Sequence, residues 1–365
     1  MQDFKYYAPT EVVFGKDAEE HLVEMINKYG GKKVLVHYGG HSAERSGLLA
    51  SVREKLNAAG ISFVELGGVK PNPRLTLVHE GIELCRKENV DFILAVGGGS
   101  VIDSSKAIGF GVKYDGDVWD IYARKYVPTD MLPVGVILTI PAAGSEMSDS
   151  SVITKEDGDL KIGYSNNICR PKFAIMNPVR TFTLPPYQTA CGATDIMMHT
   201  MERYFGKVDD MTLIDNIAEA LMRTVKDSVF HVLENPEDYR NRACIMWASS
   251  LGHNDLTGDR SYADFATHQI EHELSAMFDV AHGAGLAAVW PSWARYVMDE
   301  NVSRFARFAV NVLGVPNDFT DTKATAMAGV EAVEKFYRAI GMPTNIHELI
   351  GREITDDEIK ELARK

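Results

Sequence analysis

The spacing of apolar residues along this chain changes once, near residue 180, and this change constrains the fold more than any other feature. Before it, short β-rich runs alternate with stretches of helical periodicity; the runs are 32–38, 62–66, 91–96 and 133–141, and the helical stretches include 43–59 and 74–89. After it, long helical periods follow one another at 187–204, 210–233, 236–252 and 260–277. Strands that alternate with helices predict a doubly wound, mostly parallel sheet. We therefore predict an α/β domain at residues 1–183 and an all-α domain at residues 184–365, with the active site in the cleft between them.

The net charge, the apolar segments and the cysteines indicate which partners to exclude and which compartment to expect. A formal charge of −13 over 365 residues argues against nucleic acid or an anionic membrane as a partner, although helix N-termini can still bind a phosphate locally. The N-terminal residues lack the apolar segment of a signal peptide, and no apolar run has membrane-spanning length. Four scattered cysteines without a C-x-x-C pair predict reduced thiols, so we expect a soluble, cytoplasmic protein; they are Cys85, Cys169, Cys191 and Cys244.

Two glycine-rich turns each follow a predicted strand and open a helix. "GGGS" at 97–100 follows the strand 91–96, and "GGHS" at 39–42 follows the strand 32–38. Ligands of open α/β sheets bind beyond the carboxyl ends of the strands, where glycines allow close approach to a phosphate. The spacing is not G-x-G-x-x-G, since Ile102 occupies the last position, and a turn without a ligand is the alternative. Two such turns on one sheet favour a nucleotide.

Five potential metal ligands occur in the second half of the chain. Asp195 and His199 are four residues apart, and His268 and His272 repeat this spacing on another predicted helix. Residues at this spacing share one helix face, and His282 follows shortly afterwards. A carboxylate with imidazoles suits Fe²⁺ or Zn²⁺, and five candidates for about four positions leave one histidine for proton transfer. For the Asp195–His199 pair alone, a surface pair without a metal is the alternative.

One competing motif lies in the same segment. "HQIEH" at 268–272 fits H-x-x-E-H, the inverted zinc-peptidase signature, with Glu271 as the base. Such a short motif recurs by chance, and this interpretation leaves the glycine turns and Asp195 without a role. A metallopeptidase is therefore a remote alternative.

The chain resembles the iron-containing (group III) alcohol dehydrogenases over nearly its whole length. The turn "YGGHS" and the segment "HELSAMFDVAHG" resemble the butanol dehydrogenase branch, whose members reduce aldehydes with NADPH or NADH. Seven elements occur in the family order: "PNP" at 71–73, "GGGSVIDSSKAI" at 97–108, "IPAAGSEMS" at 140–148, Lys161, "TLPP" at 183–186, "GATDIMMHTMERY" at 192–204 and "HQIEHELSAMFDVAHGAGLA" at 268–287.

This resemblance implies a Rossmann-like first domain, a homodimer and a set of site residues. The family's metal ligands fall on Asp195, His199, His268 and His282, and its additional histidine near the nicotinamide falls on His272. Its "GTGSE" reads "AAGSE" here, which removes a hydroxyl at Ala142–Ala143. The chain also ends earlier than the resemblance leads us to expect. The cofactor-binding positions implied are Gly39, Gly40, Ser42, Asn72, Gly97, Gly98, Gly99, Ser100, Asp103, Thr139, Ser145, Lys161, Thr183 and Leu184.

The activity implied is hydride transfer between NAD(P)H and a short-chain primary alcohol or aldehyde. The metal acts as a Lewis acid on the substrate oxygen, and protons leave through a relay that includes His272. Residues 246–258 of the helical domain are expected to line the substrate pocket. A related polyol dehydrogenase or sugar-phosphate cyclase is the alternative. A cyclase needs basic residues for its phosphate, whereas 192–205 and 267–287 contain one arginine, Arg203, and no lysine.

Two positions compete for the choice of nicotinamide cofactor. In the generic dinucleotide fold an acidic residue at a strand end, here Glu65, binds the ribose and favours NAD. In the resembling family the selecting position falls on Gly39, where strict NAD users carry an aspartate. Glycine removes that charge, and the amides of residues 40–42, the Ser42 hydroxyl, and His41 or Arg45 can receive a 2′-phosphate. We therefore expect NADPH to be preferred and NADH to be possible.

Overall fold

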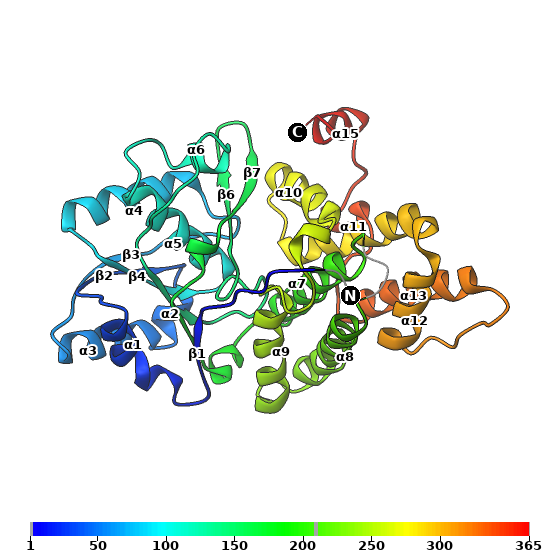
Figure 1. Cartoon of the computed structure of the whole chain (residues 1–365), viewed down its shortest axis with the longest axis horizontal. Coiled ribbons are helices and arrows are strands. Elements are labelled where there is room, and N and C mark those ends of the chain that lie inside the picture. The colour runs from blue at the N-terminus through cyan, green and yellow to red at the C-terminus, as the bar shows by residue number, and fades with distance from the viewer. Residues whose placement is uncertain (1–2, 208–210, 365) are drawn as a thin grey trace. The chain divides into compact units, whose positions relative to one another are not determined.

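The computed structural model describes residues 3–207 and 211–364. The chain forms two compact units, which are described separately (Figure 1). One comprises Tyr7–Thr181, and the other comprises the described residues from Phe182 onward together with residues 3–6. The hydroxyl of Tyr262 donates to the carbonyl oxygen of Asp3 at 2.8 Å, which ties the first residues to the helical unit.

A six-stranded parallel sheet forms the centre of the first unit, in the order β1-β8-β5-β4-β2-β3. The chain passes from β2 outward to β3 and returns to β4 on the other side of β2. The carboxyl ends of β2 and β4 therefore flank the point where the winding direction reverses, and the predicted doubly wound sheet is confirmed. The strands are β1 (Glu11–Phe14), β2 (Lys33–Tyr38), β3 (Ser62–Leu66), β4 (Phe92–Gly97), β5 (Val134–Leu138) and β8 (Phe173–Met176).

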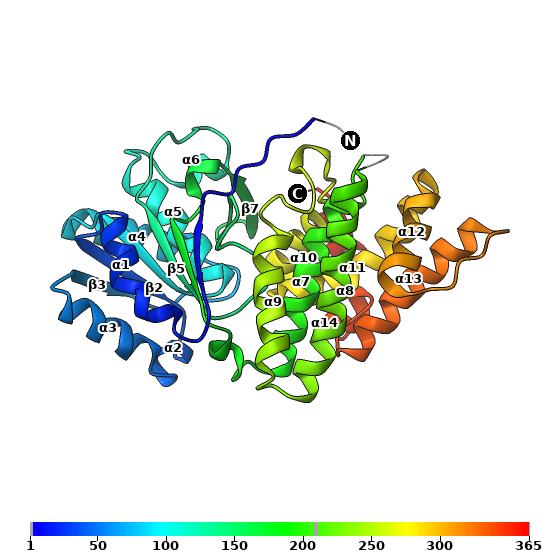
Figure 2. The same ribbon diagram turned by 60° about the horizontal axis from the view of Figure 1, so that its bottom comes forward.

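Helices cover both faces of this sheet (Figures 1 and 2). The helices α1 (Leu22–Lys28) and α3 (Leu48–Ala58) pack their apolar sides on one face, against buried residues of β2, β4, β5 and β8. The helices α4 (Leu75–Glu88) and α5 (Gly99–Val112) cover the other. Burial on both faces explains the nearly continuous apolar runs of the central strands. The shorter elements are η1 (Ala18–His21), α2 (Ser42–Arg45), α6 (Trp119–Tyr122), η2 (Asn167–Cys169) and η3 (Pro178–Thr181).

Several predicted boundaries in this unit are corrected. The strand expected at 133–141 ends at Leu138, and the helix expected at 43–59 is divided where Gly47 adopts φ 75°. The strands β1 and β8 were not predicted, because runs of four residues carry too little periodicity. The hairpin of β6 (Ser150–Lys155) and β7 (Leu160–Ser165) turns at Asp157-Gly158 as expected.

The second unit is built from helices around α7 (Pro186–Tyr204), which is buried on all sides along its second half. Helix α10 begins at Ala266 rather than at residue 260, because Phe265 adopts φ 55° and cannot continue a helix. The helix predicted from residue 210 begins at Thr212, and residue 210 lies outside the described residues. The other helices are α8 (Thr212–Glu234), α9 (Tyr239–Gly252), η4 (Arg260–Tyr262), α10 (Ala266–Phe278), α11 (His282–Val297), η5 (Met298–Glu300), α12 (Val302–Leu313), α13 (Thr322–Ala339), α14 (Ile346–Ile350) and α15 (Asp356–Leu362).

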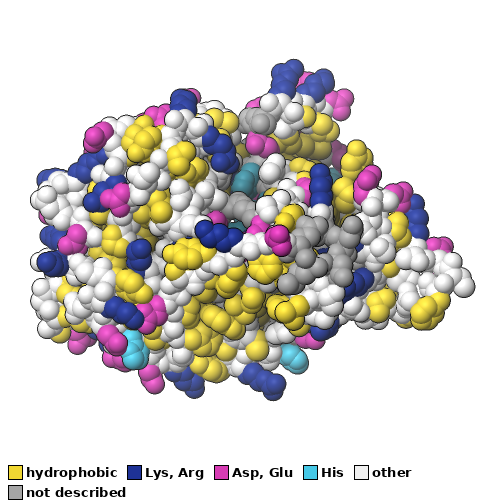
Figure 3. All heavy atoms as spheres, in the orientation of Figure 1, with side chains coloured by type: hydrophobic (Ala, Val, Ile, Leu, Met, Phe, Trp, Pro, Cys, Tyr) yellow, Lys and Arg dark blue, Asp and Glu magenta, His cyan; other side chains and the backbone are white. Residues whose placement is uncertain are grey.

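Two features of the structure concern a membrane and nucleic acid as partners: the character of its helices and the distribution of its surface charges. Within the described part of the chain, no helix has the length and apolar character required to cross a membrane. On the face shown in Figure 3, Lys and Arg side chains are scattered among Asp and Glu side chains instead of forming one basic patch.

Candidate metal and dinucleotide sites

The helical unit brings the predicted metal ligands together from three helices. Asp195 and His199 lie on α7, His268 and His272 lie on α10, and His282 is the first residue of α11. The Nε2 atoms of His268 and His282 each lie 3.8 Å from Asp195 Oδ1. The ring centroid of His199 lies 4.4 Å from that of His268. His272 stands beside this group, with its ring centroid 5.7 Å from that of His282.

Two atoms at the centre of this group fit a bound cation. Asp195 and His268 are only 4% and 5% exposed. Asp195 Oδ1 and His268 Nε2 are buried 3.8 Å apart, and neither makes a hydrogen bond of good geometry among the described residues, although Asp195 Oδ1 also lies 2.9 Å from His199 Nδ1. Leaving a buried carboxylate oxygen or ring nitrogen without a partner is costly, and a metal ion between them satisfies both. The donor set of one carboxylate oxygen with imidazole nitrogens is one that Fe²⁺ and Zn²⁺ accept.

Hydrogen bonds fix the orientation of the two best-buried imidazoles. Nδ1 of His199 lies 3.0 Å from the carbonyl oxygen of Asp195, to which it donates. Nδ1 of His268 donates to Glu202 Oε1 at 3.1 Å. An imidazole that donates through Nδ1 keeps its lone pair on Nε2, which is the state that a metal requires. Glu202 was not identified from the sequence, although its position three residues after His199 on α7 was an available signal.

Glu271 has the same role toward His282. One carboxylate oxygen of Glu271 accepts from His282 Nδ1, and the other accepts from the Ser275 hydroxyl. The Glu271 side chain is fully buried. A carboxylate held in this way is not placed to activate water, so the geometry gives the peptidase alternative no support.

The electrostatic environment also favours a cation. Burial alone raises the pKa of Asp195, but the neighbouring His199 and His282 outweigh it and hold that pKa well below the usual range. Burial lowers the pKa of His199 to about 4, so this imidazole is neutral. Burial also acts to lower the pKa of His268, but the neighbouring carboxylates of Asp195 and Glu202 raise it to about 9. Two carboxylates therefore draw positive charge to His268, and a metal ion there takes the place of a proton.

Close approach of two helices positions His282. A Cβ atom added at Gly283 would lie 2.2 Å from the carbonyl oxygen of Cys191, on the first turns of α7. Only glycine therefore allows the start of α11 to lie this close to α7. His282 immediately precedes this contact, so the contact sets its distance from Asp195.

Arg203 and His253 support the group and were not assigned these roles from the sequence. One guanidinium nitrogen of Arg203 donates to the His199 carbonyl at 2.9 Å, and another lies 3.3 Å from His253 Nδ1 and from Asp255 Oδ1. The His253 ring packs edge-on against His199, with centroids 4.0 Å apart. Part of the stretch 246–258 therefore adjoins the predicted metal ligands.

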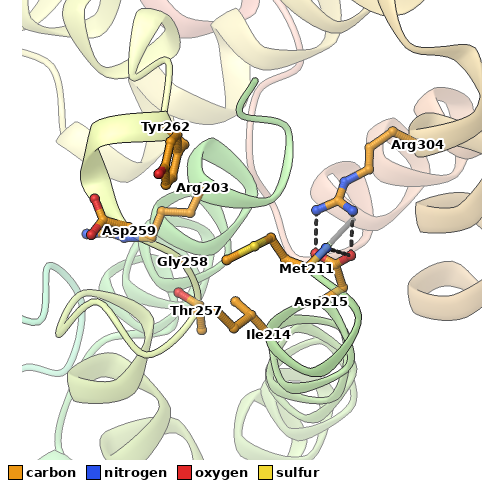
Figure 4. A pocket seen from close by; sticks show the side chains of 9 residues that line it. All are labelled: Arg203, Met211, Ile214, Asp215, Thr257, Gly258, Asp259, Tyr262 and Arg304. Carbon is orange, nitrogen blue, oxygen red and sulfur yellow. Dashed lines mark hydrogen bonds and ion pairs between the residues drawn. The ribbon is translucent and has the colours of Figure 1, made fainter. Parts of the chain in front are cut away.

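A separate small pocket lies at the far end of α7 (Figure 4). Arg304 faces Asp215 there and donates to both carboxylate oxygens at 2.6 and 2.5 Å. About 10 Å³ of free space is enough for one water molecule, and the ion pair is structural. The lining includes none of the predicted metal or cofactor residues, although Thr257 and Gly258 end the stretch 246–258 that was expected to line the substrate pocket. The lining residues are Arg203, Met211, Ile214, Asp215, Thr257, Gly258, Asp259, Tyr262 and Arg304.

In the first unit, both glycine turns lie at the same edge of the sheet. Tyr38 pairs with Val96 and Gly97 with Leu138, so β2, β4 and β5 end side by side. The amide of Thr139 donates to the Gly97 carbonyl at 3.0 Å. Gly40 and Ser42 are exposed where α2 begins, and Ser100 lies in the first turn of α5. The expected dinucleotide positions of the two turns thus flank the reversal point between β2 and β4.

The glycines of the turn at 97–99 are closely packed. A Cβ atom at Gly97 would lie 2.5 Å from Val101, one at Gly98 would lie 3.0 Å from Ile140, and one at Gly99 would lie 3.1 Å from Ala143. The close packing of this turn therefore favours glycine at all three positions.

Asp103 and Ser145 contact each other. The Ser145 hydroxyl donates to Asp103 Oδ1 at 2.5 Å, and the Val152 amide donates to Asp103 Oδ2 at 2.9 Å. The buried ammonium of Lys106 donates to the carbonyl oxygens of Ser145 and Ser150 at 2.7 Å each. These contacts hold the segment after β5 against α5, which is a role that the sequence did not reveal for Lys106.

The remaining predicted cofactor positions are distributed over both units. Asn72 is buried, with φ 54°, in the loop before α4. Lys161 lies buried on β7. Thr183 and Leu184 precede α7 in the helical unit.

Glu65, the competing selector of the cofactor, is engaged by its neighbours. Arg53 donates to Glu65 Oε1 at 2.6 Å and to Oε2 at 2.9 Å. The Tyr38 hydroxyl also lies 3.4 Å from Oε2. Both carboxylate oxygens are therefore already hydrogen-bonded.

Comparison with known proteins identifies the family. The model of the iron-containing alcohol dehydrogenase family matches residues 9–178, and the model of the C-terminal domain of the Fe-containing alcohol dehydrogenases matches residues 189–365. The chain belongs to the iron-containing alcohol dehydrogenase family. The resemblance inferred from its motifs is confirmed, and so is the expectation of an alcohol dehydrogenase.

Relatives of this alcohol dehydrogenase match it almost from end to end. The probable NADH-dependent butanol dehydrogenase 1 of Bacillus subtilis is 40% identical, over 100% of this chain and 93% of that protein. The NADPH-dependent aldehyde reductase YqhD of Escherichia coli is 35% identical, over 95% of this chain and 89% of that protein. The crystal structure of NADH-dependent butanol dehydrogenase A from Thermotoga maritima superposes with a TM-score of 0.95 at 38% identity, covering 100% of this chain and 90% of that one.

Proposed function

We propose that this alcohol dehydrogenase interconverts a short-chain primary alcohol and its aldehyde, with NAD(P)H as the hydride donor. Residues 1–183 bind the dinucleotide, and residues 184–365 hold Fe²⁺ and the substrate. The observation that carries the proposal is the pair of Asp195 Oδ1 and His268 Nε2, which are buried 3.8 Å apart without a hydrogen bond between them. The names of the relatives, which include butanol dehydrogenases and an aldehyde reductase, support the substrate class.

Asp195, His199, His268 and His282 are the residues that would hold the metal. The bound metal supplies a Lewis acid for the substrate oxygen. The chain orients the ring nitrogens through acceptors at Nδ1, and burial excludes water from Asp195 and His268. Zn²⁺ accepts the same donors, so the residues alone do not distinguish it from Fe²⁺.

His272 is the residue that we assign to proton transfer. Its side chain is partly exposed, whereas His199 and His268 are buried. It lies one turn after His268 on α10, beside His282. A partly exposed imidazole at this place can exchange protons with solvent while the buried imidazoles serve as ligands.

For the cofactor, we propose that Gly39 is the selecting position and that NADPH is preferred over NADH. Glu65, the competing position, is engaged by Arg53, so it does not offer a free carboxylate to the ribose. No carboxylate stands at Gly39 to repel a 2′-phosphate, and the exposed Ser42 begins the following helix. The relatives include NADH-dependent and NADPH-dependent enzymes, so this argument rests on the chain's own residues.

We also propose that the protein acts as a cytoplasmic homodimer, as the family resemblance implies. The state of its thiols supports a reducing compartment. Cys85, Cys169, Cys191 and Cys244 are all free in the structure.

Metal analysis of substituted proteins tests the proposed site. His268→Ala and His282→Ala are expected to lose the metal that the unsubstituted protein retains after gel filtration. His347→Ala, which removes an exposed imidazole on α14, is the matched control and is expected to retain it. Full retention of metal in both His268→Ala and His282→Ala would contradict the ligand assignment.

A further inference from the structure

Helix α10 begins without a cap from its own N-cap side chain. Phe265 occupies the N-cap position at φ 55° and makes no side-chain cap. The first amides of a helix need acceptors from elsewhere, and a carboxylate is the most favourable one beside the positive end of the helix. Two carboxylates supply them. Asp264 Oδ1 accepts from the Ala266 amide at 2.8 Å, and Glu202 Oε1 accepts from the His268 amide at 3.0 Å.

These two carboxylates differ in one respect. Glu202 Oε1 also accepts from His268 Nδ1 at 3.1 Å, whereas Asp264 accepts from the backbone amide of Ala266. Glu202 is 2% exposed and lies on α7, the helix that carries Asp195 and His199. One oxygen atom therefore holds both the backbone and the ring of His268 to the helix that supplies two other proposed ligands.

The second carboxylate oxygen of Glu202 makes no competing hydrogen bond within the described part of the chain. Glu202 Oε2 is buried and has no hydrogen-bond partner among the described residues. Among the described ion pairs, the partner of the Glu202 carboxylate is the ring of His268. The hydrogen bonds described for this buried carboxylate therefore both go to one residue, His268, through its amide and its ring.

We propose that Glu202 is a positioning residue for the metal site. It fixes His268 as the tautomer with a proton on Nδ1 and directs Nε2 toward Asp195, 3.8 Å away. A carboxylate acceptor also makes the imidazole a stronger donor to a metal than a neutral acceptor does. The inference rests on the proposed function, because it takes His268 as a ligand.

The test compares Glu202→Gln and Glu202→Ala with Asp264→Ala in the full-length protein. Each protein is loaded with Co²⁺, and its visible absorption spectrum and its rate of Co²⁺ release to EDTA are measured. Both Glu202 variants are expected to release Co²⁺ about 10–100-fold faster, with an altered spectrum. Glu202→Gln keeps an acceptor oxygen in place, so its effect is expected to be smaller than that of Glu202→Ala.

Asp264→Ala is the matched control, because it removes the carboxylate that caps the Ala266 amide at the same helix end and leaves the contact of Glu202 with the His268 ring in place. It is expected to lower the melting temperature and to release Co²⁺ at the rate of the unsubstituted protein. Release at that rate from folded Glu202→Gln and Glu202→Ala would overturn the inference. Equal acceleration by Asp264→Ala would also overturn it, by showing that capping alone is responsible. Failure of the unsubstituted protein to bind Co²⁺, or full binding by His268→Ala, would instead refute the proposed metal site.

Discussion

Replacement of Gly283 by alanine is expected to displace His282 and weaken the metal site. The added Cβ would lie 2.2 Å from the Cys191 carbonyl oxygen, and real Cβ contacts essentially never fall below 3.0 Å. The start of α11 must therefore move away from α7 by about 0.8 Å, since the obstacle is backbone and cannot rotate aside. Overpacking of this kind costs roughly 3 kcal/mol, the upper part of the usual range. For a unit of this size, that corresponds to a fall of roughly 6–12 °C in melting temperature.

The assay is differential scanning calorimetry together with metal analysis after dialysis against a weak chelator. Gly283→Ala is expected to melt lower and to retain less metal than the unsubstituted protein. Gly163→Ala serves as the control, because its Cβ would meet Val152 Cγ2 at an ordinary 3.5 Å. If Gly283→Ala matched the unsubstituted protein in both measurements, the close approach of α7 and α11 would not determine the position of His282.

Three further predictions concern other residues of the two units. His272→Ala is expected to retain its metal and to lose roughly 100-fold in kcat with an altered pH–rate profile; loss of the metal would show that His272 is a ligand. Gly39→Asp is expected to raise the KM for NADPH roughly tenfold relative to that for NADH, because a carboxylate would face the 2′-phosphate; its Cβ has room, 3.4 Å from the Val69 carbonyl. Burial lowers the pKa of His37 to about 4, so the unfolded chain binds this proton first as the pH falls. The free energy of unfolding should therefore decrease by up to roughly 3 kcal/mol between about pH 6.5 and pH 4. In urea unfolding, His37→Leu should not show this part of the decrease.

Local sequence patterns were sufficient for the main elements of the fold. Alternation of apolar residues located the central strands, and Asp157-Gly158 located the hairpin, because these signals act within a few residues. The strands β1 and β8 were missed because each has only four residues, and their pairing joins segments about 160 residues apart. The start of α10 was misplaced because Phe265 adopts a conformation that its residue type does not signal.

In the candidate site, too, residues close in sequence could be predicted, whereas contacts between distant segments could not. The spacing of Asp195 and His199 places both on one turn of α7, which a sequence reveals directly. The contact of Glu202 with His268 spans 66 residues and depends on how α7 and α10 pack. In the sequence, nothing distinguishes Lys106 from the other residues of its helix. In the structure, its buried ammonium donates to the segment after β5 and holds it in place. Contacts of this kind appear only once the elements are assembled.

The most direct test of the proposed function is NADPH or NADH consumption with short aldehydes by one preparation in three states. These are the protein as purified, the protein after removal of metal by chelation, and the stripped protein after addition of Fe²⁺. The purified and Fe²⁺-restored forms are expected to oxidise the cofactor with butanal, and the stripped form is expected to be inactive. Equal activity in the stripped form, or no cofactor consumption with any short aldehyde in any state, would contradict the proposed function.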